Sequence, residues 1–381
     1  MYKRTFLASF MITVTIFFSV ICIRCYVKGT FGNPKFYESI EESIENSLPG
    51  RRFLREIYGA SNFLLSPNEK VASDGSAFVK DEDGFLQGVN YIAYGTNEAV
   101  NHISSLDDFC KKNHIDFAYI SYPSKVDSSR TEQKYGIETN EEETREKFLE
   151  GLKANDIHVL DIRKLLEDDG YNYKDVFYKT DHHWKSQFGL YGARAIANYL
   201  NKEFGYNIDA DLLSEQEFNF INHEKIWFGE TGRSMSITWV RALDDFMEIT
   251  PSYKTSFTGD DFSNPEKLKE NGDFSILYNP SGYAGNNDLY SYSAHYSYGK
   301  YAGYGAHIHN NLIKNGKKIM IVKDSFSVVV IPFLACAASD VFVWDMRDTD
   351  DSIYDYISKN KIDAVIVAYT DFWKSKMYDF Q

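Results

Sequence analysis

Residues Ile319-Met320-Ile321-Val322-Lys323-Asp324-Ser325-Phe326 join an uninterrupted apolar run to a polar turn. A strand that is apolar on both faces is typical of the centre of a parallel sheet, because helices cover it from both sides. Ligands of open α/β sheets bind beyond the carboxyl ends of the strands. The turn that carries Ser325 is therefore a candidate functional site.

Similar apolar runs recur along the chain and alternate with amphipathic patterns of helical period. This alternation predicts an α/β fold with a mostly parallel sheet and helices on both faces. The predicted strands are 115–122, 157–161, 318–322, 341–345 and 364–369, and the predicted helices are 97–112, 140–155, 326–338 (interrupted by Pro332) and 352–359. Lys125, Asp345 and Tyr369 fall at strand ends, as Ser325 does.

A second polar stretch, Thr180-Asp181-His182-His183-Trp184, stands just before an amphipathic helical pattern. Asp can fix the tautomer of a His, and His can act as a general base. Asp181 can reach the imidazole of His183 or a neighbouring one. We expect this stretch and Ser325 to form one site, with the His183 ring roughly 2.6–3.2 Å from the Ser325 hydroxyl. The alternative is that Ser325 only caps the helix that follows it.

The pattern changes between about residues 205 and 300. The helix after the motif is predicted to place Phe188, Tyr191, Ala195 and Tyr199 on one face and to stop at Gly205. The segment beyond it is polar and rich in Gly, Asn and Ser, which predicts an aromatic-rich insertion in the main domain. It ends in a run of tyrosines, which either pack under hairpins or stack on sugar rings: Tyr290, Tyr292, Tyr296, Tyr298, Tyr301 and Tyr304.

A metal site is a competing interpretation of the same histidines. Asp181, His182 and His183 could join His307 and His309, which would share one strand face, to hold zinc. Adjacent histidines at a helix start diverge, and the sequence has neither a His-Glu-x-x-His motif nor a Cys pair in its body. We therefore expect no metal and no other cofactor.

The N-terminus predicts a membrane anchor. Lys3 and Arg4 precede an uncharged, Phe- and Ile-rich run over residues 5–23, which is long enough to span a bilayer. No small-residue cleavage site follows it, which argues against a removed signal peptide. We expect residues 1–30 to be a single-pass transmembrane anchor and residues 31–381 to form one domain on the extracytoplasmic side.

Composition restricts the class of partner. Hydrophobic residues make up 43% of the chain and charged residues 25%, as in ordinary globular proteins. The net charge of -14 argues against a nucleic-acid partner, because phosphate binding needs a basic surface. Aromatic residues reach 16%, which suits a packed core and also the flat faces of sugars.

The stretch at 180–184 resembles the signature of the DHHW family, named for its Asp-His-His-Trp motif. That family is similar to the alginate O-acetyltransferases and has an SGNH hydrolase-like fold. The resemblance continues at Gly84-Phe85-Leu86, Pro123-Ser124-Lys125, Val322-Lys323-Asp324-Ser325-Phe326, Ile331-Pro332-Phe333-Leu334 and Asp345-Met346-Arg347.

This resemblance implies a three-layer α/β/α fold with a circularly permuted motif order, in which Asp-x-His precedes the Ser. It implies that Ser325 is the nucleophile, that His183 is the general base, and that Asp181 orients the His183 ring. The Gly that usually precedes Asp-Ser in related hydrolases is Lys323 here. The Gly and Asn that supply further oxyanion donors in the superfamily have no match.

The implied function is a membrane-anchored serine O-acyltransferase that transfers acetyl groups to an envelope polysaccharide. An integral membrane acyltransferase partner is implied as the source of the acetyl group. Two alternatives keep the same fold: a carbohydrate esterase with the same triad, and a catalytically inactive glycan-binding or assembly protein.

The anchor predicts that removal of residues 1–30 leaves a soluble, folded protein, because the apolar run is confined to that segment. Size-exclusion chromatography and thermal unfolding of the truncated chain would measure this. A fragment that stays insoluble in every buffer would contradict a single N-terminal anchor.

Overall fold

The computed structural model describes residues 50–71, 77–89, 95–125, 139–262, 269–283, 288–314, 316–370 and 375–380, with isolated positions 15, 16, 19, 20 and 23. Apart from those five positions, the expected anchor over residues 1–30 lies outside the described residues. No helix within the described ranges is long and apolar enough to cross a bilayer. The chain divides into two compact units, one made of Met1–Pro67 with Ser236–Trp239, the other of Asn68–Met235 with Val240–Gln381.

In the smaller unit, helix α4 (Arg51–Leu65) lies against the start of the short helix α12 (Ile237–Val240). Thr238 donates its backbone N–H to the Glu56 carboxylate and its hydroxyl to the Glu56 carbonyl oxygen. A side chain at Gly59 would collide with Ser236, so the close approach requires glycine there.

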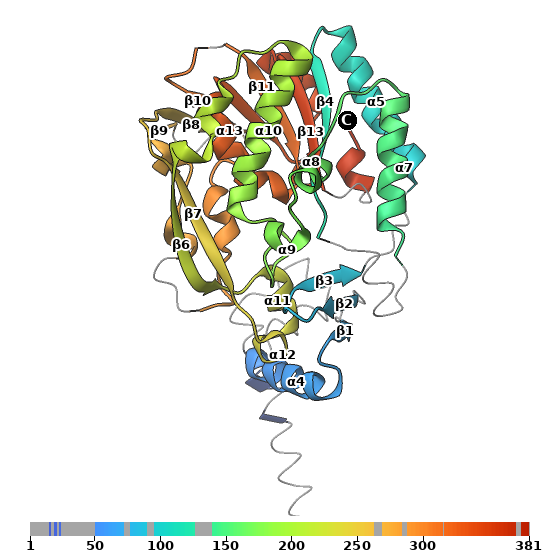
Figure 1. Ribbon diagram of the computed structural model, residues 1–381, viewed down its shortest axis with the longest axis vertical. Helices are drawn as coiled ribbons and strands as arrows, with labels where there is room; N and C mark the ends of the chain where they lie inside the picture. Colours follow the sequence, from blue (N-terminus) through green and yellow to red (C-terminus); the bar gives the residue numbers. More distant parts are fainter. Residues whose placement is uncertain are drawn as a thin grey trace, which may run out of the picture. The chain divides into compact units, whose positions relative to one another are not determined.

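The larger unit is built on an eight-stranded sheet (Figure 1) in the order β5-β4-β13-β11-β12-β10-β8-β9. The first five strands are parallel, and the last three continue the sheet in antiparallel pairing. Their bounds are β5 Val159–Asp161, β4 Asp116–Ser121, β13 Ala364–Tyr369, β11 Lys318–Lys323, β12 Asp340–Trp344, β10 Ala306–Asn310, β8 Phe257–Asp261 and β9 Glu270–Gly272. The prediction of an α/β fold with a mostly parallel sheet is confirmed.

Successive residues of the central strands enter two different cores. Ile319 and Ile321 of β11 pack on one side, whereas Met320 and Val322 pack on the other. The buried side chains of α5 (Thr96–Lys112), α7 (Glu141–Ala154) and α14 (Ile353–Asn360) belong to the second core, and those of α8 (Ile162–Asp168), α10 (Ser186–Phe204) and α13 (Ile331–Ala337) to the first. Helices thus cover both faces of the sheet, giving three layers.

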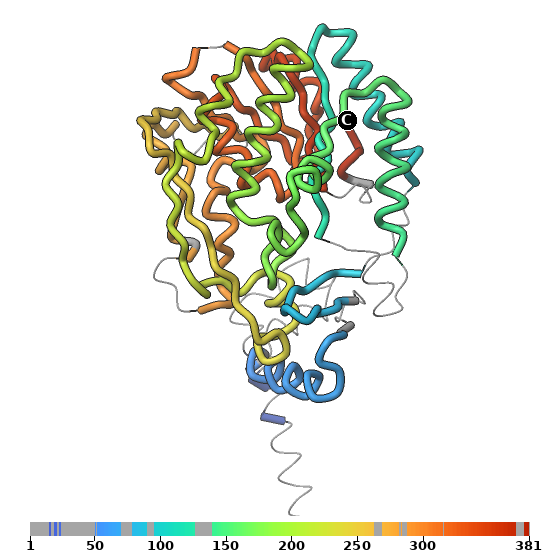
Figure 2. The backbone as a smooth tube through the Cα atoms, in the orientation of Figure 1, coloured from blue at the N-terminus to red at the C-terminus, as the bar shows by residue number. Residues whose placement is uncertain are grey.

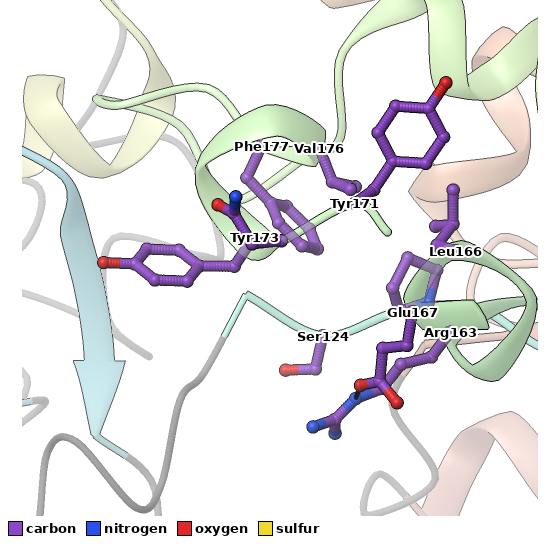
Figure 3. Close-up of a pocket in the computed structure, with 10 residues that line it drawn as sticks. Ser124, Arg163, Leu166, Glu167, Tyr171, Tyr173, Val176 and Phe177 are labelled. Atoms are coloured by element: carbon purple, nitrogen blue, oxygen red, sulfur yellow. Dashed lines mark hydrogen bonds and ion pairs between the residues drawn. The ribbon is translucent and has the colours of Figure 1, made fainter. Parts of the chain in front are cut away.

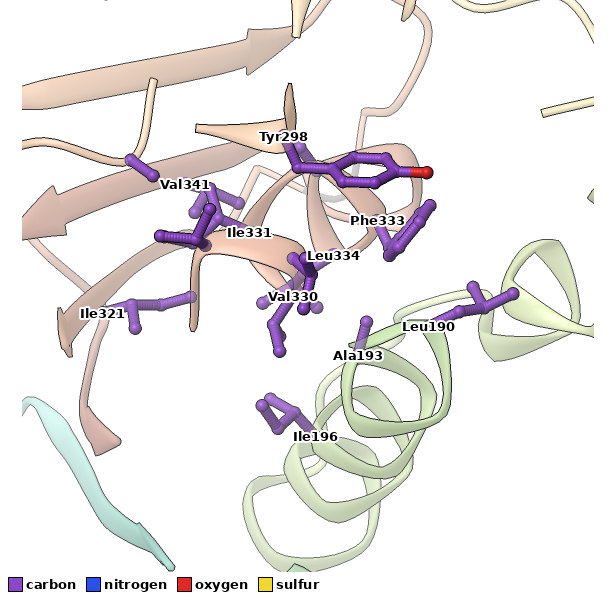
Figure 4. Close-up of a cluster of buried hydrophobic side chains, with 14 of the residues drawn as sticks. Leu190, Ala193, Ile196, Tyr298, Ile321, Val330, Ile331, Phe333, Leu334 and Val341 are labelled. Carbon is purple, nitrogen blue, oxygen red and sulfur yellow. The ribbon is translucent and has the colours of Figure 1, made fainter. Parts of the chain in front are cut away.

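Helix α10 packs against α13 through small and aliphatic residues (Figure 4). Leu190, Ala193 and Ile196 face Val330 and Leu334 across this contact. Gly205, in the left-handed conformation at φ 68°, ends α10 as the sequence predicts. On the predicted face Phe188 is buried, whereas Tyr191, Ala195 and Tyr199 are partly buried, because close contact with the next layer selects the smaller residues of the helix.

The region from 205 to 300 supplies two strands of the main sheet and also forms a separate ribbon beside it. It contains an antiparallel ribbon of β6 (Phe218–Trp227) and β7 (Asp244–Pro251), the helix α11 (Glu230–Met235), and strands β8 and β9 of the central sheet. Its 3₁₀ segment η6 (Ala294–Tyr298) reaches the neighbourhood of Ser325. A small antiparallel sheet of β1 (Glu69–Val71), β2 (Ala77–Lys80) and β3 (Leu86–Val89) precedes the first helix of the larger unit.

The approach of α10 to the turn after Ser325 predicts a cost for any side chain at Gly189. A Cβ atom there would lie 2.5 Å from Val329 Cγ2 and 2.7 Å from the Val329 carbonyl oxygen. Gly189→Ala should lower the free energy of unfolding by roughly 1–3 kcal/mol, as overpacking does, measured by urea denaturation. Gly303→Ala is the control, because nothing lies within 4 Å of its added Cβ. Equal urea midpoints for the two variants would contradict this prediction, because they would show that α10 and Val329 can move apart without cost.

Candidate active site

Polar residues gather at the carboxyl ends of the parallel strands, as expected. Pro123-Ser124-Lys125 follow β4, Ser325 follows β11, Asp345 follows β12 and Thr370 follows β13. The stretch at 180–184 lies between the short helix α9 (Tyr173–Val176) and α10, and a bridge from Phe177 to Trp184 closes its base.

Asp181, His183 and Ser325 form a continuous hydrogen-bonded chain. His183 Nδ1 lies 2.6 Å from Asp181 Oδ1, and His183 Nε2 lies 2.8 Å from Ser325 Oγ. The expected contact between His183 and Ser325 is thereby confirmed. Asp181 and His183 are buried, and Ser325 is partly exposed. The arrangement is that of an acid that orients an imidazole beside a hydroxyl.

The Asp181 carboxylate accepts two further hydrogen bonds. Oδ1 also accepts the backbone N–H of His183, and Oδ2 accepts the backbone N–H of Glu230 at 2.6 Å. Burial alone would raise the pKa of Asp181. The imidazoles of His183 and His182 and the N–H of Glu230 outweigh burial and hold this pKa well below its usual range. Asp181 is therefore a carboxylate at any pH near neutrality.

Two buried side chains hold the loop that carries Asp181. Lys125 Nζ donates to the carbonyl oxygens of Lys179 and Asp181, at 2.9 and 2.8 Å. Asp244, the first residue of β7, accepts the backbone N–H groups of Lys179 and Thr180 and the Thr180 hydroxyl. Sequence reasoning placed Lys125 at a strand end but missed Asp244, whose only signal was an acid at the start of an apolar strand.

Gly229 completes this support, because no side chain fits there. Its N–H donates to the Thr180 hydroxyl, and an added Cβ would lie 2.4 Å from Asp181 Cβ. Sequence reasoning missed Gly229 and Glu230 as well, since their donors are backbone groups that any sequence supplies.

Asp324, not Ser325, caps the turn that follows β11. Asp324 Oδ1 accepts the N–H of Phe326, and Oδ2 accepts the N–H of Thr370. The alternative in which Ser325 is the helix cap is therefore wrong, and the Ser325 hydroxyl is left to His183. The following segment is a 3₁₀ turn, η7 (Ser325–Val329), and Pro332 lies at the start of α13 instead of interrupting a longer helix.

Trp184 is a packing anchor. It is fully buried, and its indole N–H donates to the Phe326 carbonyl oxygen at 3.0 Å. Gly192 of α10 lies directly against the indole, where a Cβ would come within 2.7 Å of the ring. The indole therefore ties the 180–184 stretch to the turn that carries Ser325.

The side chain of Lys323 forms an ion pair with Asp345. Its ammonium lies 2.7 Å from Asp345 Oδ2, and Arg347 binds the same carboxylate through two nitrogens at 2.8 and 2.6 Å. Burial acts to raise the pKa of Asp345, but the hydrogen bonds and charges of Arg347 and Lys323 lower it to about 2. A buried ion pair thus stands where related hydrolases have a glycine.

The histidines of the metal hypothesis separate into two groups. His307 and His309 share a strand face, as expected, but both hydrogen-bond to Asp340 at 2.9 Å. Asp181, His182 and His183 present ligand atoms within 4.8 Å of one another. The Asp181 oxygens already accept three N–H groups, two from His183 and one from Glu230, so the donor set fits the hydrogen-bonded chain better than an ion.

The tyrosine-rich stretch packs more than it exposes. Tyr292, Tyr298 and Tyr301 are buried, whereas Tyr296 is 49% exposed. Its ring lies edge-on to the His183 ring at a centroid distance of 6.2 Å. The neighbouring His295, which sequence reasoning missed, is fully buried and donates from Nε2 to the Ser325 carbonyl oxygen at 2.9 Å. A single His within a run of tyrosines was the only available signal.

A cavity of about 290 Å³ (Figure 3) lies beyond the end of β4. Tyr171, Tyr173, Arg163 and Glu167 line it, together with Ser124. It includes none of the three residues of the hydrogen-bonded chain. Arg163 is paired with Glu167 and Glu142, so the charges at this cavity satisfy one another.

The burial of Lys125 predicts a pH-dependent stability. Desolvation lowers the pKa of Lys125 from 10.5 to about 8. The unfolded chain therefore binds more protons than the folded one between pH 8 and 10.5, so stability rises with pH in this window. Relative to Lys125→Met, the wild type should gain on the order of 3 kcal/mol of unfolding free energy across it. Urea titrations of both proteins at pH 7.5, 8.5 and 9.5 would measure the gain, and a constant difference would contradict it.

Comparison with known proteins agrees with the geometry. Residues 93–226 match a family described as the SGNH hydrolase-like domain of acetyltransferase AlgX, and the matched segment includes Asp181 and His183. No curated protein matches the chain in sequence.

Solved structures share the fold. PatB1 of Bacillus cereus with a sulfonyl adduct is 20% identical, with a TM-score of 0.64 over 82% of this chain and 99% of that one. A DHHW family protein from Eubacterium siraeum is 18% identical, with a TM-score of 0.57 over 79% of this chain and 93% of that one. The chain is thus similar to the SGNH-type O-acetyltransferases and to the DHHW proteins that its motif indicated.

Proposed function

We propose that the protein is a membrane-anchored, extracytoplasmic serine O-acyltransferase that acetylates an envelope polysaccharide. Ser325 is the nucleophile, His183 the general base and Asp181 the residue that orients it. The observation that carries this proposal is the unbroken chain from Asp181 Oδ1 through the His183 ring to Ser325 Oγ. The match to the SGNH hydrolase-like acetyltransferase family supports the reaction class.

The first half of the reaction forms an acyl-enzyme. His183 Nε2 takes the Ser325 proton as Oγ attacks the carbonyl carbon of an acetyl ester. Asp181, a carboxylate at neutral pH, stabilises the imidazolium that results. His183 then returns the proton to the leaving group as the tetrahedral intermediate collapses.

The developing oxyanion has one clear backbone donor. The N–H of Phe326 is already bonded to Asp324 Oδ1, so it does not serve. No described residue accepts a hydrogen bond from the N–H of Ser325. This N–H is the oxyanion donor that we propose.

Tyr296 is our candidate for holding the acceptor sugar. Of the tyrosines between 290 and 304 it is the one that combines an exposed ring with contact to the His183 ring. A sugar stacked there would present a hydroxyl to the acyl carbon, and its ring would compete with water for the site. This favours transfer over the alternative of simple ester hydrolysis.

The location and partner follow from the N-terminal sequence and from the family resemblance. An uncleaved anchor over residues 1–30 would hold the domain outside the membrane, next to envelope glycans. There an integral membrane acyltransferase could supply the acetyl group.

The central test compares two single variants, Ser325→Ala and Asp181→Asn, with the wild type. Ser325→Ala should abolish acetyl transfer while changing the free energy of unfolding by less than about 1 kcal/mol, because Asp324 supplies the cap. Asp181→Asn should lower the rate by roughly 10²–10⁴-fold by presenting the wrong tautomer. The assay supplies an activated acetyl ester with and without envelope oligosaccharide and detects acetylated sugar by mass spectrometry.

Ser327→Ala is the matched control, since Ser327 lies in the same turn but bonds to Tyr122. It should cost about 1 kcal/mol of stability and leave transfer intact. Release of free acetate that no sugar affects would make the protein an esterase. Full activity of Ser325→Ala would contradict the proposed triad. A wild-type protein that binds glycan but transfers no acetyl group would favour the non-catalytic alternative.

A further inference from the structure

His295 contacts the candidate triad from a segment far away in sequence. It lies on η6, is 0% exposed, and its Nε2 is 2.9 Å from the Ser325 carbonyl oxygen. A carbonyl oxygen only accepts, so Nε2 carries the proton of the ring. The same serine is thus held twice by imidazoles: His183 holds its hydroxyl and His295 holds its peptide group.

The His295 ring also stacks on the His183 ring. Their centroids are 4.0 Å apart and their planes differ by 17°. The His182 ring lies 3.9 Å from His183 as well, so two imidazoles contact the base. These rings exclude water from the faces of His183 and restrict its rotation about the line between Asp181 and Ser325.

His295 is held as a neutral imidazole. Its Nδ1 is buried and has no hydrogen-bond partner among the described residues. The charged or titratable groups around it are His183, His182 and Asp181, with Tyr296 edge-on at 5.4 Å. Burial first, and the charge of His183 second, lower the pKa of His295 well below its ordinary value. A neutral ring avoids a second cation beside the imidazolium that forms on His183.

We propose that His295 is a positioning residue for acyl transfer, which fixes the Ser325 peptide and the plane of the His183 ring together. Neither contact involves the reacting atoms, so His295 acts through Ser325 and His183. This proposal rests on the function proposed above for Asp181, His183 and Ser325, and it adds His295 to that site as a fourth side chain.

Two substitutions separate the two contacts. His295→Phe keeps a ring against His183 but removes the donor to the Ser325 carbonyl. His295→Gln keeps an N–H donor near the position of Nε2 but removes the ring. The readout is the rate at which a fluorophosphonate modifies Ser325, which requires no sugar, together with kcat and KM for an acetyl ester. His223→Gln is the control, since His223 bonds to Glu248 on the β6–β7 ribbon.

His295→Phe should slow Ser325 phosphonylation at least tenfold and lower kcat with KM unchanged. His295→Gln should recover part of that rate through its N–H donor without reaching the wild-type rate, because it lacks the stacked ring. His223→Gln should match the wild type. Phosphonylation of His295→Phe at the wild-type rate would overturn the proposal. The proposal would also be overturned if the phosphonylation rates of the two His295 variants fell only in proportion to their folded fractions, which thermal unfolding would measure.

A measurement on the unmodified chain covers the case in which a variant fails to fold. ¹⁵N-histidine spectra should show His295 as the neutral Nε2–H tautomer from pH 5.5 to 8, and its resonances should move when Ser325 is phosphonylated. A His295 that titrates in this range would overturn the proposal. Phosphonylation that slows in His295→Phe, in a protein that acetylates no sugar, would leave this inference standing and remove the proposed acceptor.

Discussion

The site depends on one buried carboxylate that accepts three hydrogen bonds. Asp181 accepts from the His183 ring, the His183 backbone and the Glu230 backbone, while its own carbonyl oxygen accepts from Lys125. A charge without these partners would be too costly to bury. These donors come from the 180–184 stretch itself, from the start of α11 and from Lys125 beyond the end of β4, so the position of Asp181 depends on all three parts of the fold.

The turn with Ser325 is fixed by an equally dense set of contacts. Asp324 ties it to the end of β13, Trp184 binds the Phe326 carbonyl, and His295 binds the carbonyl of Ser325 itself. Ser325 thus bonds to imidazoles through two groups, its hydroxyl to His183 and its carbonyl to His295, and of these the hydroxyl is the one that has a proton to give up. Preorganisation of this kind is what makes a hydroxyl and an imidazole act as a pair, because no energy is spent on aligning them during the reaction.

The central sheet could be predicted from the sequence, since strands such as β11 and β13 are apolar on both faces and few other structures tolerate that pattern. Asp181, His183 and Ser325 could be named because their residue types stand at turns. The support from Asp244, Gly229 and His295 could not, because it comes from a region without a clear period, and its contacts are set by tertiary packing. In α10, likewise, Gly189 and Ala193 are buried because they fit against a neighbouring segment, which their hydrophobicity does not reveal.

The strand order has a consequence for how the chain reaches its native state. β13, the last strand in sequence, lies between β4 and β11 at the centre of the sheet, as the red trace beside β4 shows (Figure 2). The early β4–β5 pair cannot join the remaining strands until the chain has been synthesised to Tyr369. Closure of the sheet is thus a late, non-local event of high contact order, which slows folding. A ribosome-bound chain that has not yet reached the end of β13 therefore holds Asp181 and His183 without the closed sheet that places Ser325 beside them.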